Sequence, residues 1–351
     1  MTARLHVFLG AGGVGKTTLA AGYALALARA PGRRVGLLGI DPSRRLKDAL
    51  HVELTDAGAP VPSAAALRAA VLDPAESVRR WAAEACPDLA MREALARNPF
   101  FGALADRLAT ATDIFAAARV AEWAEHEPGL TDLVVDTAPG QNAIEFLTRP
   151  ERVAALLGGR LVGWLRRLAP GAATGAPGRL QGGALRLAGG LVRIGGLRLL
   201  SDLAGFFWLV DGLFTRMGSR VEATRHWLHE GDTRLLVVTS VRHDGAERAT
   251  ELASALARAG LGPYAVVVNR AVGPALAAHA PDLERAMAGD ARAAPVVRYA
   301  LAYAALEARV ATAVRALAPV TALVANARGL DGDARLEALA ELGERLLIDL
   351  G

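Results

Sequence analysis

The sequence is poor in cysteine and in lysine. Cys86 is the single cysteine among 351 residues, which excludes an internal disulfide and a metal site made of several cysteines within one chain. The 40 basic residues include only two lysines, Lys16 and Lys47, so arginine carries nearly all of the positive charge. No block of basic residues stands out, and a net charge of +4 in so arginine-rich a composition gives no reason to expect a nucleic-acid partner.

Long uncharged apolar runs are missing as well. The most apolar region, residues 182–214, is interrupted by five charged side chains, so it lacks the roughly 18 uncharged residues that a membrane crossing requires. The amino terminus has no basic segment ahead of a cleavable apolar stretch. We therefore expect a cytoplasmic protein without stable membrane insertion, and a hydrophobic content of 52% is sufficient for a large core.

What the sequence does contain is a phosphate-binding loop. Residues 10–18, Gly-Ala-Gly-Gly-Val-Gly-Lys-Thr-Thr, match the pattern G-x-x-x-x-G-K-[ST] and follow an apolar run at residues 5–9. Glycines let the backbone wrap around an anion, with its N–H groups pointing inward at the start of a helix. The lysine would lie along the β- and γ-phosphates, and the first threonine would bind Mg²⁺. The residues predicted to bind the nucleotide are Gly12, Gly13, Val14, Gly15, Lys16, Thr17 and Thr18.

The scarcity of lysine supports this assignment. A phosphate cradle accepts a compact ammonium group on a flexible stem, whereas a planar guanidinium is bulkier and prefers a forked partner. A lysine at position 16, in a chain that otherwise uses arginine, is therefore expected for chemical reasons. No such chemical reason applies to Lys47, for which both a functional role and a surface role remain open.

Apolar runs that recur along the chain predict a parallel β-sheet. Most are followed by helical patterns, and residues 75–127, 246–259 and 334–347 are the clearest of these. Continuous apolar runs suit strands covered by helices on both faces, and ligands bind in the loops that follow such strands. We therefore predict an α/β fold. The expected strands are Leu5–Leu9, Val35–Ile40, Leu133–Val135, Leu235–Thr239 and Ala265–Val268.

Two aspartates directly follow expected strands. Asp41 comes after the run at residues 35–40, and Asp136 comes after the run at residues 133–135. A nucleotide hydrolase needs one carboxylate to hold Mg²⁺, usually through water, and one polar group to orient the attacking water. We assign the first role to Asp136 and the second to Asp41. A strand-end aspartate can also be only a helix cap or a turn former.

Taken together, these motifs resemble those of the ArsA family of P-loop ATPases. That family includes the arsenite-pump ATPase and the eukaryotic ATPase that targets tail-anchored membrane proteins. The resemblance is carried by the loop at residues 10–18, by Asp-Pro-x-x-x-x-x-Asp-Ala at 41–49 and by Asp-Thr-Ala-Pro at 136–139. It continues more loosely through residues 142–147 and 266–270, and it is closest to the single-domain bacterial members.

The resemblance implies a P-loop NTPase fold, with a mostly parallel sheet flanked by helices. It implies a single ATPase domain over residues 1–351, with a helical insertion at residues 151–220 beside the nucleotide core. The glycine pairs spaced among apolar residues in that region fit such an insertion. The resemblance also implies a homodimer that closes around two nucleotides and reshapes the insertion, which would present a surface to an unidentified protein client.

The same resemblance implies ATP and Mg²⁺ as the ligands. Lys16 and Asp41 would be the catalytic residues. Thr17 and Asp136 would hold Mg²⁺, the aspartate through water. Asn269 would contact the adenine.

Two features depart from the family pattern. Ala11 stands where the family usually has a second lysine that reaches the nucleotide of the partner subunit, so we expect slow hydrolysis. Arg44, Arg45 or Lys47 could supply the missing charge, since an inserted cation can neutralise charge in the transition state. The lone Cys86 can neither pair on zinc across a dimer nor hold arsenite with other cysteines, which argues against arsenite extrusion.

Three functions remain open on the sequence alone. The first is an ATP-dependent molecular switch whose nucleotide controls the insertion and, through it, a client. The second is a positioning ATPase of the ParA or MinD kind, which requires a basic terminal amphipathic helix or a basic patch for membrane or DNA; neither is visible. The third is a nucleotide-binding scaffold with negligible turnover, which Ala11 would favour.

Overall fold

The computed structural model describes most of the chain outside its central third, and its contacts divide the chain into two units. The described residues are 3–41, 45–85, 89, 92–93, 112–139, 215–272, 276, 278–287, 289–290, 292–318, 320–324 and 333–351. Unit 1 comprises Met1–Leu72, Trp123–Thr148 and His226–Gly351, and unit 2 comprises Asp73–Glu122 and Arg149–Arg225. Cys86, Arg44 and nearly all of the expected insertion at residues 151–220 lie outside the described residues, so the boundaries of that insertion stay a prediction.

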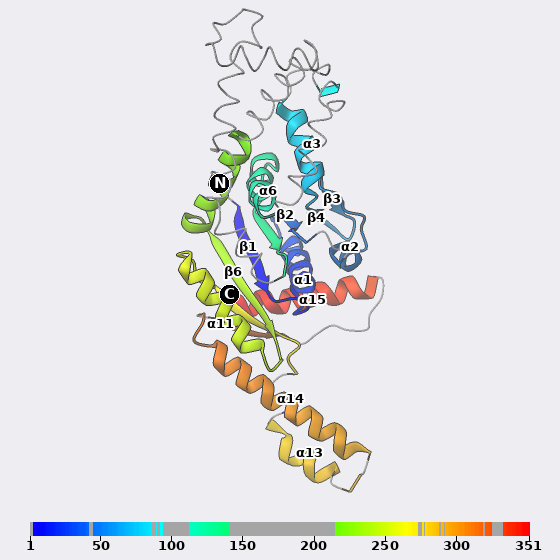
Figure 1. Ribbon diagram of the computed structural model, residues 1–351. Coiled ribbons are helices and arrows are strands. Elements are labelled where there is room, and N and C mark those ends of the chain that lie inside the picture. The colour runs from blue at the N-terminus through cyan, green and yellow to red at the C-terminus, as the bar shows by residue number, and fades with distance from the viewer. Residues whose placement is uncertain are drawn as a thin grey trace, which may run out of the picture. The chain divides into compact units, whose positions relative to one another are not determined.

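Unit 1 is built on an eight-stranded sheet with the order β3-β4-β2-β5-β1-β6-β7-β8 (Figure 1). Neighbouring strands are parallel, except that β3 pairs antiparallel with β4 at one edge. The strands are β1 (Arg4–Gly10), β2 (Val35–Gly39), β3 (Ala59–Val61), β4 (Ala64–Val71), β5 (Asp132–Asp136), β6 (Thr233–Ser240), β7 (Ala265–Asn269) and β8 (Val320–Val324). All five expected strands and the mostly parallel α/β fold are confirmed.

The apolar pattern missed β3, β4 and β8. β4 is rich in alanine, and only its last residues are buried without interruption, so it lacks the continuous run of large apolar side chains that marks β1 or β7. β3 is a three-residue edge strand that contains a proline. Strands of this kind are recognised by their pairing partners rather than by their own composition.

Helices flank the sheet in unit 1. After β1 the chain enters α1 (Lys16–Arg29), a helix rich in alanine and leucine whose central residues are all buried. Among the described residues, the other helices that lie wholly in this unit are α2 (Arg45–Leu50), α11 (Gly245–Arg258), α13 (Ala280–Met287), α14 (Ala293–Val314) and α15 (Asp333–Leu350). The helices expected at residues 246–259 and 334–347 correspond to α11 and α15.

The carboxyl-terminal helix α15 lies directly on α1 (Figure 1). The two backbones approach so closely that a Cβ atom on Gly22 would collide with the carbonyl oxygen of Leu339, and one on Gly343 would collide with the carbonyl oxygen of Gly22. The buried apolar residues of α15 join the same core cluster as α1, namely Leu339, Ala340, Leu342, Leu346 and Leu350. This helix is therefore a packed element of the nucleotide core.

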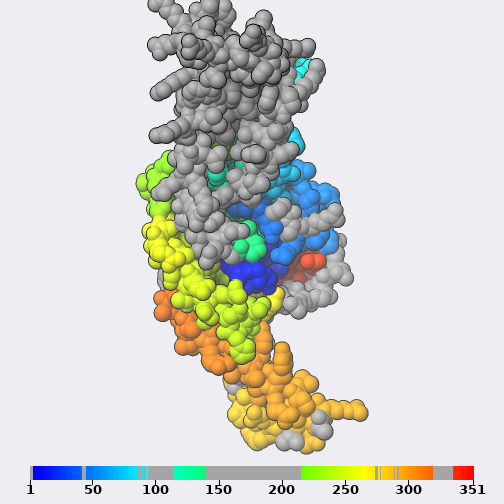
Figure 2. Space-filling view, in the orientation of Figure 1, coloured from blue at the N-terminus to red at the C-terminus, as the bar shows by residue number. Residues whose placement is uncertain are grey.

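Helix α14 leaves the sheet together with α13, and Figure 2 shows the two as a yellow and orange projection. The buried residues of α14 all lie in its second half, from Ala304 to Val314, and α13 has none. In the first half of α14, Val296 and Tyr299 are 67% and 72% exposed. Only the second half of α14 is thus anchored in the core.

The described part of unit 2 is helical and has an aromatic centre. It includes α3 (Pro74–Ala85) and most of α6 (Thr112–His126), as expected for the helical pattern at residues 75–127. Trp81 stacks on Phe115 with ring centroids 5.5 Å apart, and the Thr224 hydroxyl donates to the Ala117 carbonyl at 2.7 Å. Among the described residues of either unit, no helix has the length and hydropathy needed to cross a membrane.

Candidate nucleotide-binding site

The ends of five neighbouring strands meet at one edge of the sheet in unit 1. Parallel register places Phe8 of β1 and Gly39 of β2 beside Asp136 of β5, and it places Ser240 of β6 beside Asn269 of β7. The phosphate loop continues directly from β1 at this edge. Because parallel strands all end on the same side of a sheet, residues far apart in the sequence come together here.

The loop between β1 and α1 has the geometry of an anion-binding turn. Gly15 adopts a left-handed conformation, with φ 97°, and precedes α1 without any side-chain cap. The first turn of α1 contains no acidic residue, so its free N–H groups and positive dipole end are available to an anion. A Cβ atom at position 15 would collide with the side-chain nitrogen of Asn269, which explains the glycine. Gly12 and Gly13 are exposed at the tip of the loop.

Lys16 folds back along this loop. Its Nζ atom donates to the carbonyl oxygens of Gly10 and Ala11, each at 3.0 Å, and the residue is only 6% exposed. Burial lowers the pKa of Lys16, and the nearby carboxylates of Asp136 and Asp41 oppose that shift. The ammonium group is therefore held at the mouth of the loop by weak neutral acceptors, which an anionic phosphate can replace.

Asp136 is buried at the end of β5 and faces Thr17. Burial raises the pKa of Asp136 to about 6, although a hydrogen bond with the Thr17 side chain and the charge of Lys16 act against the shift. Its Oδ1 atom is buried and has no hydrogen-bond partner among the described residues. A hydroxyl beside a carboxylate with an unsatisfied oxygen is a suitable ligand pair for Mg²⁺, directly or through water. The two residues predicted for the metal thus lie together.

Asp41 lies close to the same charges. It follows β2, the strand hydrogen-bonded to β5, and the amide of Ile40 donates to the Asp136 carbonyl at 2.8 Å. The negative charge of Asp41 acts on the pKa of both Lys16 and Asp136, and the positive charge of Arg45 acts on both in the opposite direction. The structure therefore brings the predicted water-orienting residue to the phosphate loop.

Asn269 braces the loop. Its Nδ2 atom donates to the Val14 carbonyl oxygen at 2.8 Å, its Oδ1 atom accepts from the Arg270 amide at 2.8 Å, and the side chain is buried. The family resemblance implied that this residue contacts the adenine, and that contact stays a prediction. What the geometry shows is an amide that fixes the backbone of the phosphate loop from the neighbouring strand end.

Arg270 reaches the same loop, and sequence reasoning assigned it no role. Its Nη2 atom donates to the Gly13 carbonyl oxygen at 2.7 Å. The only sequence signal was its place, immediately after a strand-end asparagine at the ligand-binding edge of a parallel sheet.

Three further residues discussed from the sequence lie in or near this loop or on α2, and the predicted role of Thr18 at the nucleotide stays a prediction. The Ala11 side chain is half-buried against the core, and Thr18 is half-buried in the first turn of α1. Lys47 lies at the surface of α2, where its Nζ atom is 3.5 Å from a carboxylate oxygen of the exposed Glu53. The structure thus separates the two lysines, one inside the loop and one in a surface ion pair, and a surface pair of this kind contributes little to stability.

The fold and this edge define a class of protein: a P-loop NTPase. Such proteins combine three features that are present here. They are a glycine loop between β1 and α1, a buried lysine at the end of that loop, and an aspartate at the end of a neighbouring parallel strand. A family comparison narrows the class. The sequence model of the anion-transporting ATPases, the ArsA family, matches residues 3–170, and this match supports membership of that family of P-loop ATPases. No curated protein matches the chain significantly.

Proposed function

We propose that this chain binds ATP together with Mg²⁺ at residues 10–18 and hydrolyses it slowly. The family match supports a nucleotide-binding and hydrolysing protein. The observation that carries the proposal is the buried Asp136, whose Oδ1 atom lacks a partner among the described residues beside Thr17 and Lys16. An unsatisfied buried acceptor costs about 1–3 kcal/mol, and a bound cation would offset that cost.

These residues would have separate roles in phosphoryl transfer. Lys16 would exchange the carbonyls of Gly10 and Ala11 for the β- and γ-phosphates. Thr17 and Asp136 would hold Mg²⁺, which neutralises charge on the phosphates when it is bound. Asp41 would orient the attacking water, because it is the remaining carboxylate whose charge acts on this cluster.

We further propose that nucleotide binding controls a homodimer and, through residues 151–220, a protein client. The support is the ArsA resemblance together with the exposure of Gly12 and Gly13, which leaves the tip of the loop open to a second subunit. Arsenite transport is not part of the proposal, because the lone Cys86 cannot form a site of several cysteines.

Of the two other candidates, the scaffold remains the stronger. α15 buries most of its large apolar residues in the core cluster that it shares with α1, which argues against use of this helix as a membrane anchor for a positioning ATPase. A nucleotide-binding scaffold with negligible turnover is favoured by Ala11, because it leaves the loop with Lys16 as its only lysine.

The chain offers a matched pair of lysines for the test. Fluorescent ATP titration with Mg²⁺, phosphate release and size-exclusion chromatography would be measured on wild type, Lys16→Ala, Asp41→Asn and Lys47→Ala. We expect Lys16→Ala to weaken ATP binding about 100-fold or more. Asp41→Asn should keep binding but release phosphate about 100-fold more slowly. Lys47→Ala should behave as wild type, since its ion pair with Glu53 is exposed.

Each alternative predicts a different result. Unchanged ATP binding in Lys16→Ala would reject the nucleotide site itself. Binding without any phosphate release in wild type would favour the scaffold. ATP-dependent co-sedimentation with liposomes or with DNA would favour the positioning ATPase.

A further inference from the structure

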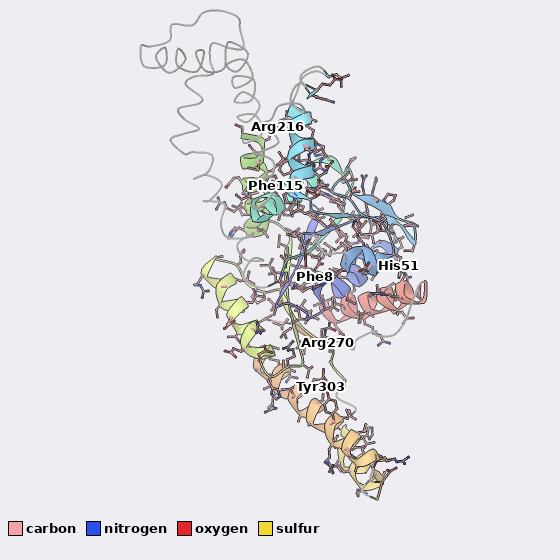
Figure 3. All side chains as sticks on the ribbon, turned by 45° about the vertical axis from the view of Figure 1, so that its right-hand side comes forward. Phe8, His51, Phe115, Arg216, Arg270 and Tyr303 are labelled. Carbon is pink, nitrogen blue, oxygen red and sulfur yellow. The ribbon has the colours of Figure 1, made fainter. Side chains whose placement is uncertain are left out.

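The backbone immediately after β7 is held in an unusual conformation. Arg270 has φ 63°, one of two left-handed non-glycine residues among those described. This conformation is unfavourable for a residue with a Cβ atom, so it persists only where surrounding contacts determine it. The Arg270 amide donates to Asn269 Oδ1, and the Arg270 carbonyl oxygen accepts from the Tyr303 hydroxyl at 2.8 Å. Figure 3 labels Arg270 and Tyr303 where the strand end meets α14.

A second contact fixes the same bend of the backbone after β7, which we call the corner. The Val272 amide donates to Glu307 Oε2 at 2.6 Å, and Glu307 is buried on the same helix as Tyr303. Because Tyr303 and Glu307 are four residues apart, they lie one above the other on one face of α14. This helix therefore fixes the segment after β7 at two points, Arg270 and Val272.

From this fixed corner, two side chains hold two successive peptides of the phosphate loop. Arg270 donates to the Gly13 carbonyl oxygen at 2.7 Å, and Asn269 donates to the Val14 carbonyl oxygen at 2.8 Å. In a trans peptide the C=O and N–H groups point in opposite directions. The N–H groups of Val14 and Gly15 must therefore point away from the two side chains, which leaves them free for a ligand of the loop.

We propose that Arg270 is a positioning residue, which orients the loop peptides so that their N–H groups receive the β-phosphate of a bound nucleotide. This inference rests on the proposed nucleotide site. Gly13 has φ 74°, and a Cβ atom there would meet no other atom within 4 Å, so nothing packs on that side of Gly13 to restrain the peptide. The guanidinium supplies that restraint through a charge-assisted hydrogen bond, and Tyr303 holds the backbone from which it extends.

The test compares four variants with wild type. Arg270→Met keeps a long side chain but removes every donor, whereas Arg270→Lys keeps the charge and a donor group at its end. Tyr303→Phe removes the hydroxyl that holds the Arg270 carbonyl and keeps the ring. Arg309→Met, at an exposed position of α14, is the matched control. Dissociation constants would be measured for ATP, ADP and pyrophosphate, with Mg²⁺, and thermal unfolding would be measured without ligand.

We expect Arg270→Met to weaken all three ligands about tenfold and by the same factor, since each offers a phosphate to the same N–H groups. Arg270→Lys should recover most of that loss, and Tyr303→Phe should show a smaller loss in the same direction. Arg309→Met should bind as wild type. Unfolding of the ligand-free protein should change little, because the bond of Arg270 to Gly13 lies at the exposed tip of the loop.

Other patterns would overturn the inference. A loss confined to ATP would mean that Arg270 touches the γ-phosphate, and a loss absent for pyrophosphate would mean that it touches the nucleoside. Wild-type affinity in Arg270→Met would show that the loop does not depend on this bond. A fall in thermal stability that accounts for the whole loss of binding would make the residue only a structural brace. If wild type binds none of the three ligands, the proposed function fails instead.

Discussion

His6 and Asp132 form a buried polar pair between two neighbouring strands of unit 1. His6 Nε2 lies 3.0 Å from Asp132 Oδ1, and both side chains are almost completely inaccessible. The other ring nitrogen, Nδ1, is 3.2 Å from the Tyr23 hydroxyl on α1. The tautomer that satisfies both contacts carries its proton on Nε2, where it donates to the carboxylate, while Nδ1 accepts from tyrosine. This chain of side chains ties α1 to β1 and β5 beneath the phosphate loop.

The pair predicts that acid destabilises the protein in two steps. Burial lowers the pKa of His6, so the unfolded chain binds the proton more readily, and stability should fall as pH drops below about 6.5. For Asp132, burial acts to raise the pKa, but hydrogen bonds from His6, Thr131 and Arg33 outweigh it and lower the pKa to about 2. The contribution of this carboxylate should therefore be lost between about pH 4 and pH 2.

Denaturant unfolding of His6→Gln across this range would check the first step. Glutamine keeps an amide donor toward Asp132 but cannot titrate, so the slope of stability against pH between 6.5 and 5 should become shallower than in wild type. His243→Gln, at an exposed position, should leave the slope unchanged. An identical slope in His6→Gln and wild type would contradict the prediction.

Asp136→Asn should make the ligand-free protein more stable and the site less responsive to Mg²⁺. The substitution removes a buried negative charge whose Oδ1 atom has no partner among the described residues, and we expect a gain of about 1–3 kcal/mol. Wild type should bind ATP more tightly when Mg²⁺ is added, and the variant should lose most of that increase. Scanning calorimetry of the ligand-free protein measures the change in stability, and titration calorimetry with and without Mg²⁺ measures the affinity for ATP. The exposed Asp349→Asn is the control. A destabilised Asp136→Asn with full Mg²⁺ dependence would refute the assignment.

Gly343→Ala should destabilise the protein, although alanine is the better helix former. Intrinsic propensity favours alanine over glycine by about 1 kcal/mol within a helix. Here the new Cβ atom would meet the backbone of α1 at Gly22, which cannot move aside as a side chain could. We expect a net loss of about 1–3 kcal/mol, the range for overpacked cores. Thermal unfolding would be compared with Glu341→Ala, an exposed position of the same helix. A stabilised Gly343→Ala would mean that the two helices are not in close contact.

Ala11→Lys should raise the rate of ATP hydrolysis if a homodimer forms. A cation inserted at the phosphates of the partner subunit neutralises charge in the transition state, and we expect an increase of about tenfold or more. Ala11→Met introduces similar length without charge and serves as the control. Phosphate release would be measured over a range of protein concentrations alongside size-exclusion chromatography with ATP. Equal rates in the two variants would show that the missing lysine does not limit turnover.

Local sequence patterns were sufficient for the elements that carry their own signal. The glycine loop at residues 10–18 and the five continuous apolar runs were predictable, because close approach to an anion demands glycine and burial on both faces demands unbroken apolar residues. The positions of Asp41 and Asp136 followed from those runs, since parallel strands end on the same side of a sheet. Their closeness to Lys16 was therefore predictable from topology alone.

The tertiary structure decided what depends on contacts between distant segments. β4 and β8 became recognisable through their neighbours in the sheet, and the approach of Gly22 to Gly343 could not be inferred from either helix by itself. The same holds for Asn269 and Arg270, which lie more than 250 residues from the carbonyl groups they hold. The sequence by itself determined that this chain has a nucleotide loop, because that signal is local. Only the fold determined which side chains hold the loop in shape, because hydrogen bonds between remote residues leave no periodic trace in the sequence.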